Sequence, residues 1–278
     1  MLSANAHSAL LERHFEREAA FWRNVYRQPT LYGELYRQRM ATVLQLAAFP
    51  DLPAGGRAAE IGCGAGMATV ALAKRGWRVE AVDIAPSMVA QTQRQVESEG
   101  VADLVEVRQG DINHLDLPLG SFDLVLAVGV LEWMPRLDEP LAGLAAILKP
   151  GGRLIVNIDN SQALHCWLDP RLLPIAGPAK RLALSAARRF HWIDANPRPA
   201  TCSRSRLRRA LRTAGLSTVV DRTIGFGPFS FLGRPLFSEA CALRLHRQLQ
   251  AFADRGVPLL RHAGSTSVVL ARKAGGRV

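Results

Sequence analysis

The residues best suited to chemistry in this sequence form a glycine-rich segment, Glu60-Ile61-Gly62-Cys63-Gly64-Ala65-Gly66. Glycine adopts positive φ angles and lets a ligand approach the backbone without a Cβ clash. Such turns occur in nucleotide-binding sites and in purely structural turns. The dinucleotide-binding fingerprint requires glycine where this chain has Met67, and a P-loop requires a Gly-Lys-Ser/Thr triplet that does not follow. Both of those alternatives are therefore disfavoured.

Two aspartates occupy positions suited to hold the rest of a nucleotide-like ligand. Asp83 ends the apolar run 79–82, about 20 residues past the glycines, where a carboxylate can accept hydrogen bonds from both ribose hydroxyls. Asp111 similarly follows the next apolar run. In an open parallel sheet the ligand lies at the carboxyl ends of adjoining strands, where the strand order reverses. Gly62, Asp83, Asp111 and Val128 all map to that edge, which predicts one shared site.

The elements that must position these residues alternate between short apolar runs and amphipathic helices. The expected strands are residues 58–61, 79–82, 104–107, 124–128 and 154–158. The expected helices between them are residues 67–74, 86–97 and 137–147. This alternation predicts an α/β fold with a mostly parallel sheet covered on both faces. Later runs at 217–220 and 267–270 are candidates for further strands.

Residues 1–49 predict two helices that precede the sheet. The first is expected to direct Leu10, His14, Ala20 and Phe21 toward one packed face. Arg39, in the second, has two interpretations: contact with a carboxylate of a bound ligand, or a solvated helix face, which is the place we expect. Proline and glycine residues then mark a linker to the first strand.

Composition limits the classes of protein that this chain can be. It has 278 residues, of which 48% are hydrophobic, and this excludes a disordered protein. Its 4 cysteines form no CxxC pair, so neither zinc nor any other metal is expected, nor a disulfide framework. The apolar run 124–131 is far shorter than the roughly 20 residues that span a bilayer. The N-terminus resembles no signal peptide, so we expect a soluble cytoplasmic protein.

Five segments, in this order and spacing, resemble the class I S-adenosylmethionine-dependent methyltransferases, especially the group with ubiquinone/menaquinone-type and small-molecule methyltransferases. The segments are EIGCGAG (60–66), AVDIAPSMV (81–89), QGDI (109–112), FDLVLAVGVLEWM (122–134) and LKPGGRLIV (148–156). The resemblance implies a Rossmann-like, seven-stranded sheet of order 3-2-1-4-5-7-6. Its last strand, residues 267–270, would be antiparallel.

The resemblance also implies S-adenosyl-L-methionine as the cofactor. The glycine segment would hold its methionine part, the second strand end its ribose and the third strand end its adenine. The residues carried over to these roles are Glu60, Gly62, Cys63, Gly64, Asp83, Ile84, Asp111, Ile112 and Val128.

Many members of the family carry histidine where this chain has Trp133, so proton transfer by that histidine is not carried over. An indole can instead wall a pocket or stack on a flat substrate. His165, just after the fifth strand, is our candidate catalytic base. Tyr32, Trp133 and Phe226 are the candidates for substrate binding.

The positive charge is concentrated in one stretch of the chain. The formal net charge is +11, and residues 171–212 contain eleven Lys and Arg against Asp194 alone. Within this stretch, Lys180–Trp192 is a candidate basic amphipathic helix. It fits an anionic substrate or a nucleic acid, peripheral membrane contact through residues 180–193, or a merely solvated insertion.

These observations predict a domain plan and a function. Residues 1–50 form a helical cap. Residues 51–278 form the methyltransferase domain, with a cofactor half at 57–160, a basic insertion at about 161–212 and the last strands at about 213–278. The predicted reaction is methyl transfer to an oxygen or nitrogen of a small, largely apolar or aromatic acceptor. The alternatives are a tRNA-modifying methyltransferase that uses residues 171–212 and a non-catalytic, cofactor-binding partner protein. The oligomeric state is not assigned.

Overall fold

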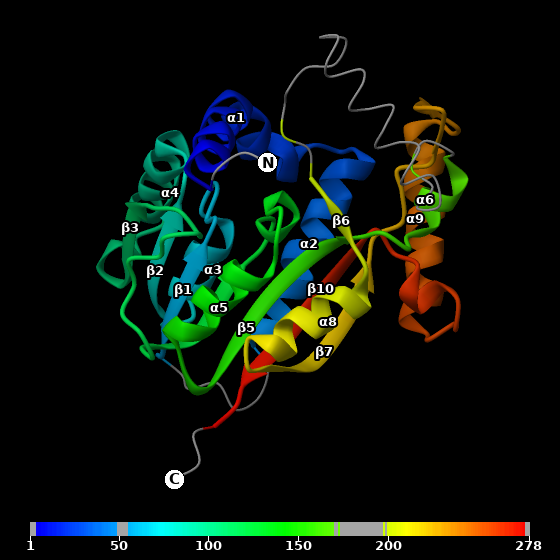
Figure 1. The fold of residues 1–278 in the computed structure, drawn as a ribbon. Coiled ribbons are helices and arrows are strands. Elements are labelled where there is room, and N and C mark those ends of the chain that lie inside the picture. Colours follow the sequence, from blue (N-terminus) through cyan, green and yellow to red (C-terminus); the bar gives the residue numbers. More distant parts are fainter. Residues whose placement is uncertain (1–3, 49–54, 170–171, 173–196, 198, 276–278) are drawn as a thin grey trace.

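The computed structural model describes residues 4–48, 55–169, 172, 197 and 199–275. Its main sheet has the strand order β3-β2-β1-β4-β5-β10-β7 (Figure 1). These strands are β1 (Arg57–Ile61), β2 (Arg78–Asp83), β3 (Val105–Gln109), β4 (Phe122–Ala127), β5 (Leu148–Asn160), β7 (Leu216–Ile224) and β10 (Thr266–Lys273). A two-residue strand, β6 (Thr201–Cys202), pairs with the end of β5. Strand β10 is antiparallel to both of its neighbours. The predicted order and the antiparallel last strand are therefore confirmed.

The central strands consist of near-continuous apolar residues because both faces of the sheet are covered. Ala59 and Val125 face one cluster of buried side chains, to which Leu144 and Leu207 of the covering helices also belong. Ala58 and its pairing partner Leu124 face a second cluster on the opposite side. Alternate residues of each strand thus enter different halves of the core.

Helices cover the two faces of the sheet. Helices α5 (Asp138–Ile147) and α8 (Arg204–Thr213) contribute to the first cluster, and α2 (Leu31–Ala47) and α3 (Met67–Ala73) contribute to the second. Helix α4 (Pro86–Ser98) lies beside β2 and β3, and the one-turn helix η2 (Ala102–Leu104) leads into β3. The short helices η1 (Val25–Arg27), η3 (Leu131–Trp133) and η5 (Leu260–His262) lie in connections.

Helix α1 (Ala4–Asn24) lies across the end of the sheet at which the parallel strands finish (Figure 1). Of the predicted packed face, His14 contacts the Trp133 ring, but Ala20 and Phe21 are exposed. The inward face instead carries Leu11, Phe15 and Trp22, which repeat at helical spacing. These side chains turn inward because the space beneath α1 is lined mostly by apolar side chains.

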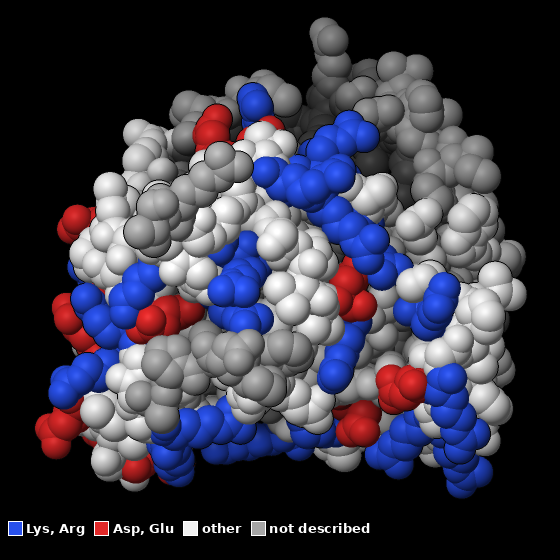
Figure 2. Space-filling model, turned by 90° about the horizontal axis from the view of Figure 1, so that it is seen from below, with Lys and Arg blue, Asp and Glu red and all other residues white. Residues whose placement is uncertain are grey.

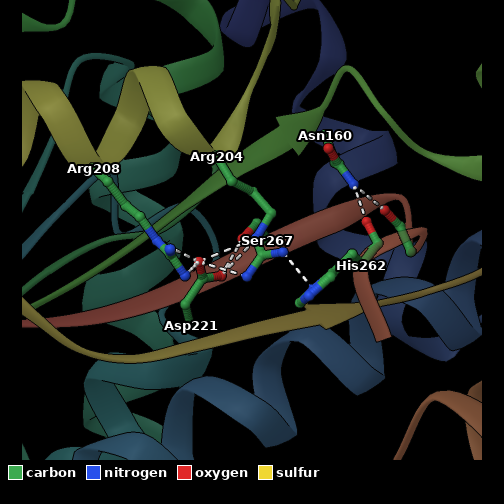
Figure 3. Close-up of polar contacts among 7 residues, drawn as sticks. Asn160, Arg204, Arg208, Asp221, His262 and Ser267 are labelled. Carbon is green, nitrogen blue, oxygen red and sulfur yellow. Dashed lines mark hydrogen bonds and ion pairs between the residues drawn. The ribbon is translucent and has the colours of Figure 1, made fainter. Parts of the chain in front are cut away.

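Helix α8 is attached to β7 by a buried carboxylate, shown in Figure 3. Asp221 accepts hydrogen bonds from Arg204 at 2.8 Å, from Arg208 at 2.7 Å and from Ser267 at 2.7 Å. Burial alone would raise the pKa of Asp221, but these hydrogen bonds outweigh it and lower the pKa. Arg204 also contacts His262. Two arginines of this basic helix are therefore paired within the protein.

A smaller group of elements packs against α2 and the short helix η5, which itself contacts β7. It consists of α6 (Leu164–Leu168), the hairpin of β8 (Ser230–Phe231) and β9 (Arg234–Pro235), and α9 (Glu239–Asp254). The predicted helix at 180–192 lies outside the described residues. Within the part of the chain that is described, no helix is long and apolar enough to cross a bilayer.

Candidate functional site

A cavity opens at the carboxyl ends of β1, β2 and β4, beneath helix α1. It encloses about 1000 Å³ including its open mouth. The N-terminal segment contributes Leu11, Phe15, Trp22, Tyr26, Arg39 and Met40 to its walls. The sheet edge contributes all nine residues that the sequence assigned to the cofactor. The structure therefore brings that set together in one place.

The glycine segment forms the floor of this cavity. Gly62 and Gly64 have φ angles of +77° and +55°, in the left-handed region that favours glycine. A Cβ atom at Gly62 would approach Cγ2 of Val130 to 2.4 Å, whereas a Cβ at Gly64 would meet no atom within 4 Å. Open space thus faces the Gly64 backbone, as the approach of a ligand requires. Burial raises the pKa of the neighbouring Cys63, which keeps its thiol protonated and unreactive.

Asp83 joins the end of β2 to the glycine segment. Its carboxylate accepts hydrogen bonds from the backbone N–H of Gly64 at 2.8 Å and of Ala85 at 3.0 Å. Each carboxylate oxygen can accept a further hydrogen bond, so the side chain retains capacity for two ribose hydroxyls. Burial raises the pKa of Asp83 and outweighs the opposing effect of the backbone hydrogen bonds.

Asp111 connects the third strand end to helix α1. It accepts hydrogen bonds from the Ser8 hydroxyl at 2.5 Å and from the backbone N–H of Asn113 at 3.0 Å. Ile112 is buried beside it and lines the same cavity. Ser8 was not singled out from the sequence, because its contact with Asp111 spans more than a hundred residues of chain.

Glu60 is a buried acid on the wall of the cavity. Burial raises its pKa to about 8, repulsion from Asp83 adds to this, and the hydrogen bond from the Thr69 hydroxyl at 2.5 Å opposes it. No ion pair within the described chain neutralises Glu60. A ligand with an ammonium or sulfonium group would supply the missing positive charge, and S-adenosylmethionine carries both. The residues present therefore fit this cofactor.

Trp133 closes the cavity together with helix α1. Its ring contacts the Phe15 ring edge-on at 5.1 Å and the His14 ring at 5.1 Å, measured between ring centroids. The His7 ring nitrogen Nε2 lies 2.9 Å from the backbone oxygen of Trp133. Trp133 thus lies where a pocket wall was expected, and its contact with substrate stays a prediction.

The other three candidate residues lie away from this cavity's lining. His165 is half-buried, 3.3 Å from the Ser265 hydroxyl, and burial lowers its pKa. Tyr32 is 51% exposed near the start of α2. Phe226 is 1% exposed and packs in a separate cluster with Leu31. Their predicted catalytic and substrate roles stay predictions.

Arg39 differs from its expected place on a solvated helix face. It is 9% exposed and lines the cavity, with its guanidinium carbon 4.6 Å from the centre of the Tyr36 ring. Burial raises the pKa of Tyr36 to about 12. Apolar periodicity gave no signal for Arg39, because a buried arginine looks like a surface one in a sequence pattern.

Among the described residues, no group of His, Cys, Asp and Glu side chains is arranged to hold a metal ion.

Comparison with known proteins places the chain among methyltransferases. Residues 59–156 match the family model described as "Methyltransferase domain". Trans-aconitate 2-methyltransferase of Methylobacterium nodulans is 33% identical over 239 residues, which cover 82% of this chain and 89% of that enzyme. Ubiquinone biosynthesis O-methyltransferase of Xanthomonas axonopodis pv. citri is 34% identical over 109 residues. That match spans 39% of this chain and 45% of the relative's length, so less than half of the relative is represented.

Solved structures share the fold at low sequence identity. Magnesium protoporphyrin IX methyltransferase from Synechocystis, with bound S-adenosylhomocysteine, superimposes with a TM-score of 0.60 at 17% identity, over 96% of this chain and 99% of that one. Geranyl diphosphate methyltransferase in complex with S-adenosylmethionine gives a TM-score of 0.54 at 18% identity, over 87% and 88%. The match to trans-aconitate 2-methyltransferase over most of both chains, the shared fold and the cavity that fits S-adenosylmethionine all indicate the same family. The chain therefore belongs to the class I S-adenosylmethionine-dependent methyltransferase family.

Proposed function

We propose that this chain transfers the methyl group of S-adenosylmethionine to an oxygen or nitrogen atom of a small, largely apolar or aromatic acceptor. The observation that carries the proposal is one cavity that combines the cofactor set with the aromatic rings of Phe15, Trp22 and Trp133. Rings of this kind favour flat or apolar ligands. The names of the relatives, trans-aconitate 2-methyltransferase and ubiquinone biosynthesis O-methyltransferase, also favour a small molecule.

The cofactor supplies a methyl group on a positively charged sulfur, which leaves as a neutral thioether. The protein's task is therefore to align the acceptor with that methyl group and to keep water away. Asp83 would fix the ribose, and the backbone from Gly62 to Gly64 would hold the methionine part. Helix α1, through Leu11 and Phe15, covers the site against solvent.

The first test is removal of the ribose contact. We expect Asp83→Ala to weaken binding of S-adenosylhomocysteine at least about a hundredfold, since two hydrogen bonds to a charged group contribute about 1.5–3 kcal/mol each. Titration calorimetry measures the affinity, and thermal melting reports whether the variant folds. Asp103→Ala, at an exposed aspartate in η2, is the matched control. A folded Asp83→Ala protein with near-normal affinity would overturn the assignment.

A second measurement separates an enzyme from a non-catalytic cofactor-binding protein. The chain is incubated with S-adenosylmethionine labelled in its methyl group and with a cell extract that contains both small molecules and RNA. We expect label to appear in an organic-soluble acceptor. Cofactor binding without label transfer to small molecules or to RNA would favour the non-catalytic alternative, and label in RNA would favour the tRNA alternative.

A further inference from the structure

Thr92 lies in the middle of helix α4 and reaches across to the glycine segment, residues 60–66. Its side chain is fully buried. Its hydroxyl donates a hydrogen bond to the backbone oxygen of Gly64 at 2.8 Å and lies 3.5 Å from Sγ of Cys63. A Cβ atom added at Gly66 would lie 3.1 Å from Cγ2 of Thr92. One side chain of α4 therefore lies against three residues of the glycine segment.

This hydrogen bond differs from the one that a helical threonine usually makes. A threonine hydroxyl inside a helix commonly bonds the carbonyl oxygen four residues earlier in the same helix. Thr42 of α2 does so, with the backbone oxygen of Gln38 at 2.9 Å. Thr92 instead donates to a different element. Because threonine also has a low intrinsic helix propensity, the stability of α4 gives no reason for threonine at this buried position.

The backbone N–H groups of residues 62–66 show which donor the glycine segment offers to a ligand. Four of the five are paired within the protein: Gly62 and Cys63 with Val82, Gly64 with Asp83, and Gly66 with Cys63. The fifth, that of Ala65, has no hydrogen-bond partner among the described residues. Ala65 lines the cavity. Since backbone donors in folded proteins are nearly always paired, a bound ligand is the partner that this N–H lacks.

Thr92 fixes the direction of that donor. The carbonyl of Gly64 and the N–H of Ala65 belong to one planar peptide unit, in which the two groups point in opposite directions. Because Thr92 holds the Gly64 oxygen on the side of α4, the Ala65 N–H is directed away from α4. Glycine tolerates most backbone angles, so without this hydrogen bond the peptide unit would be free to turn.

We propose that Thr92 is a positioning residue of the cofactor site: it fixes the peptide unit between Gly64 and Ala65 so that the Ala65 N–H donates a hydrogen bond to an oxygen atom of the bound cofactor. The inference rests on the proposed function, since it treats the cavity as the cofactor site. Thr92 is not part of the cavity lining and acts through the glycine segment. The cofactor has two kinds of oxygen that accept such a bond, the ribose hydroxyls and the carboxylate of its amino-acid part.

The variants Thr92→Val and Thr92→Ser separate the hydroxyl from the packing of the side chain. Valine keeps the shape of threonine but cannot donate to Gly64, whereas serine keeps the donor. We expect Thr92→Val to weaken binding of S-adenosylhomocysteine about tenfold, and Thr92→Ser to stay within about threefold of the wild type, since only valine releases the peptide unit. Titration calorimetry measures the affinities, and thermal melting reports whether each variant folds.

Thr42→Val is the matched control. It also removes a buried threonine hydroxyl from the interior of a helix, but the hydrogen bond that it removes stays within α2. We expect this variant to melt at a lower temperature and to bind S-adenosylhomocysteine with unchanged affinity. A role of Thr92 in folding alone would make Thr92→Val behave in the same way.

A second ligand identifies the oxygen that accepts the bond. 5′-Methylthioadenosine keeps the ribose of S-adenosylhomocysteine but lacks the amino-acid part. If Thr92→Val loses affinity for S-adenosylhomocysteine and not for 5′-methylthioadenosine, the carboxylate is the acceptor. Equal losses for both ligands assign the bond to the ribose. In backbone-assigned NMR spectra of the wild type, the amide proton of Ala65 should move downfield when either accepting ligand binds.

The outcomes separate failure of this inference from failure of the proposed function. Equal affinity of the wild type and Thr92→Val for S-adenosylhomocysteine, or an equal loss in Thr92→Ser, shows that the inference is wrong while the proposed function stands. If Thr92→Val does not fold, the wild-type NMR signal decides, and an Ala65 amide proton that does not move at saturation overturns the inference. If S-adenosylhomocysteine does not bind the wild type at all, both are wrong.

Discussion

Glu60 is buried beneath the glycine segment, and the hydroxyl of Thr69 donates a hydrogen bond to it. Burial raises its pKa to about 8 from an ordinary value of 4.5. The folded protein therefore holds this proton more tightly than the unfolded chain does. Stability from this difference is fully present below about pH 4.5 and is lost as pH rises toward about 8. A cationic cofactor would reverse the loss, because its charge stabilises the ionised carboxylate.

The first prediction at this scale concerns Glu60→Gln in the unligated protein. The amide keeps an oxygen for Thr69 but cannot ionise, so the free energy of unfolding should fall less between pH 5 and 8 than in the wild type; the part that remains comes from other buried acids such as Asp83. At about pH 8 the variant should be more stable than the wild type by on the order of 2–4 kcal/mol. Urea unfolding at several pH values measures this. Affinity for S-adenosylhomocysteine should fall in the same variant.

Glu106→Gln, at an exposed glutamate in β3, provides the comparison. Its unfolding free energy should follow that of the wild type at each pH. A Glu60→Gln protein with the wild-type pH dependence would show that the buried carboxyl does not titrate as we infer.

Helix α1 is the element that turns an open sheet edge into an enclosed site. It contacts the core through Leu11 and contacts Trp133 through Phe15. It is also tied to the third strand end by the Ser8–Asp111 hydrogen bond. All of these contacts join α1 to other elements, so tertiary packing, and not the intrinsic helix propensity of α1, fixes its position over the cavity. Its position should therefore matter for ligand binding.

We predict that Phe15→Ala weakens S-adenosylhomocysteine binding about tenfold and lowers thermal stability modestly. The lost ring removes the edge-on contact with Trp133 and opens the cavity to water. Phe21→Ala is a control on the same helix, because Phe21 is 37% exposed and contacts the Trp22 ring from outside. Calorimetry on both variants checks the expectation, and equal losses of affinity would argue against a covering role for α1.

At the scale of the whole molecule, one face carries more Lys and Arg than Asp and Glu (Figure 2), although residues 171–212 hold nearly all of the net charge. Figure 2 views the end at which the parallel strands begin, and Lys and Arg cover more of that face than Asp and Glu do. Arg57 and Arg78 begin β1 and β2 there, and both are exposed. This basic face lies opposite the cavity, so the charge it carries is remote from the proposed methyl transfer.

The third prediction uses the arginines of α8 that Asp221 does not pair. Arg206, Arg209 and Arg212 are exposed. Replacing all three with glutamine should leave S-adenosylhomocysteine affinity and methylation of small acceptors unchanged. Binding of RNA at low salt should weaken, with a shallower salt dependence, because fewer phosphates are neutralised. Filter binding and a labelled-methyl assay measure the two quantities. Loss of methyl transfer to RNA with intact cofactor affinity would favour the tRNA alternative.

The sequence by itself determined the fold and the cofactor edge of the site. Gly62, Asp83 and Asp111 each lie at or just past the end of a strand, and parallel strands end at one edge, so local spacing was enough to bring them together. The strand order and the reversed last strand were implied by the family resemblance and not by local spacing, and the structure confirms both.

The tertiary structure alone decided which other side chains reach the cavity. Arg39 and Phe15 arrive from helices that precede the sheet, and their direction depends on how those helices pack. Phe226 and His165, our candidates for substrate contact and catalysis, are not part of the lining of this cavity, and their roles stay predictions. Periodicity reports that a residue is buried on one face of an element, but contacts between distant segments decide what lies against that face.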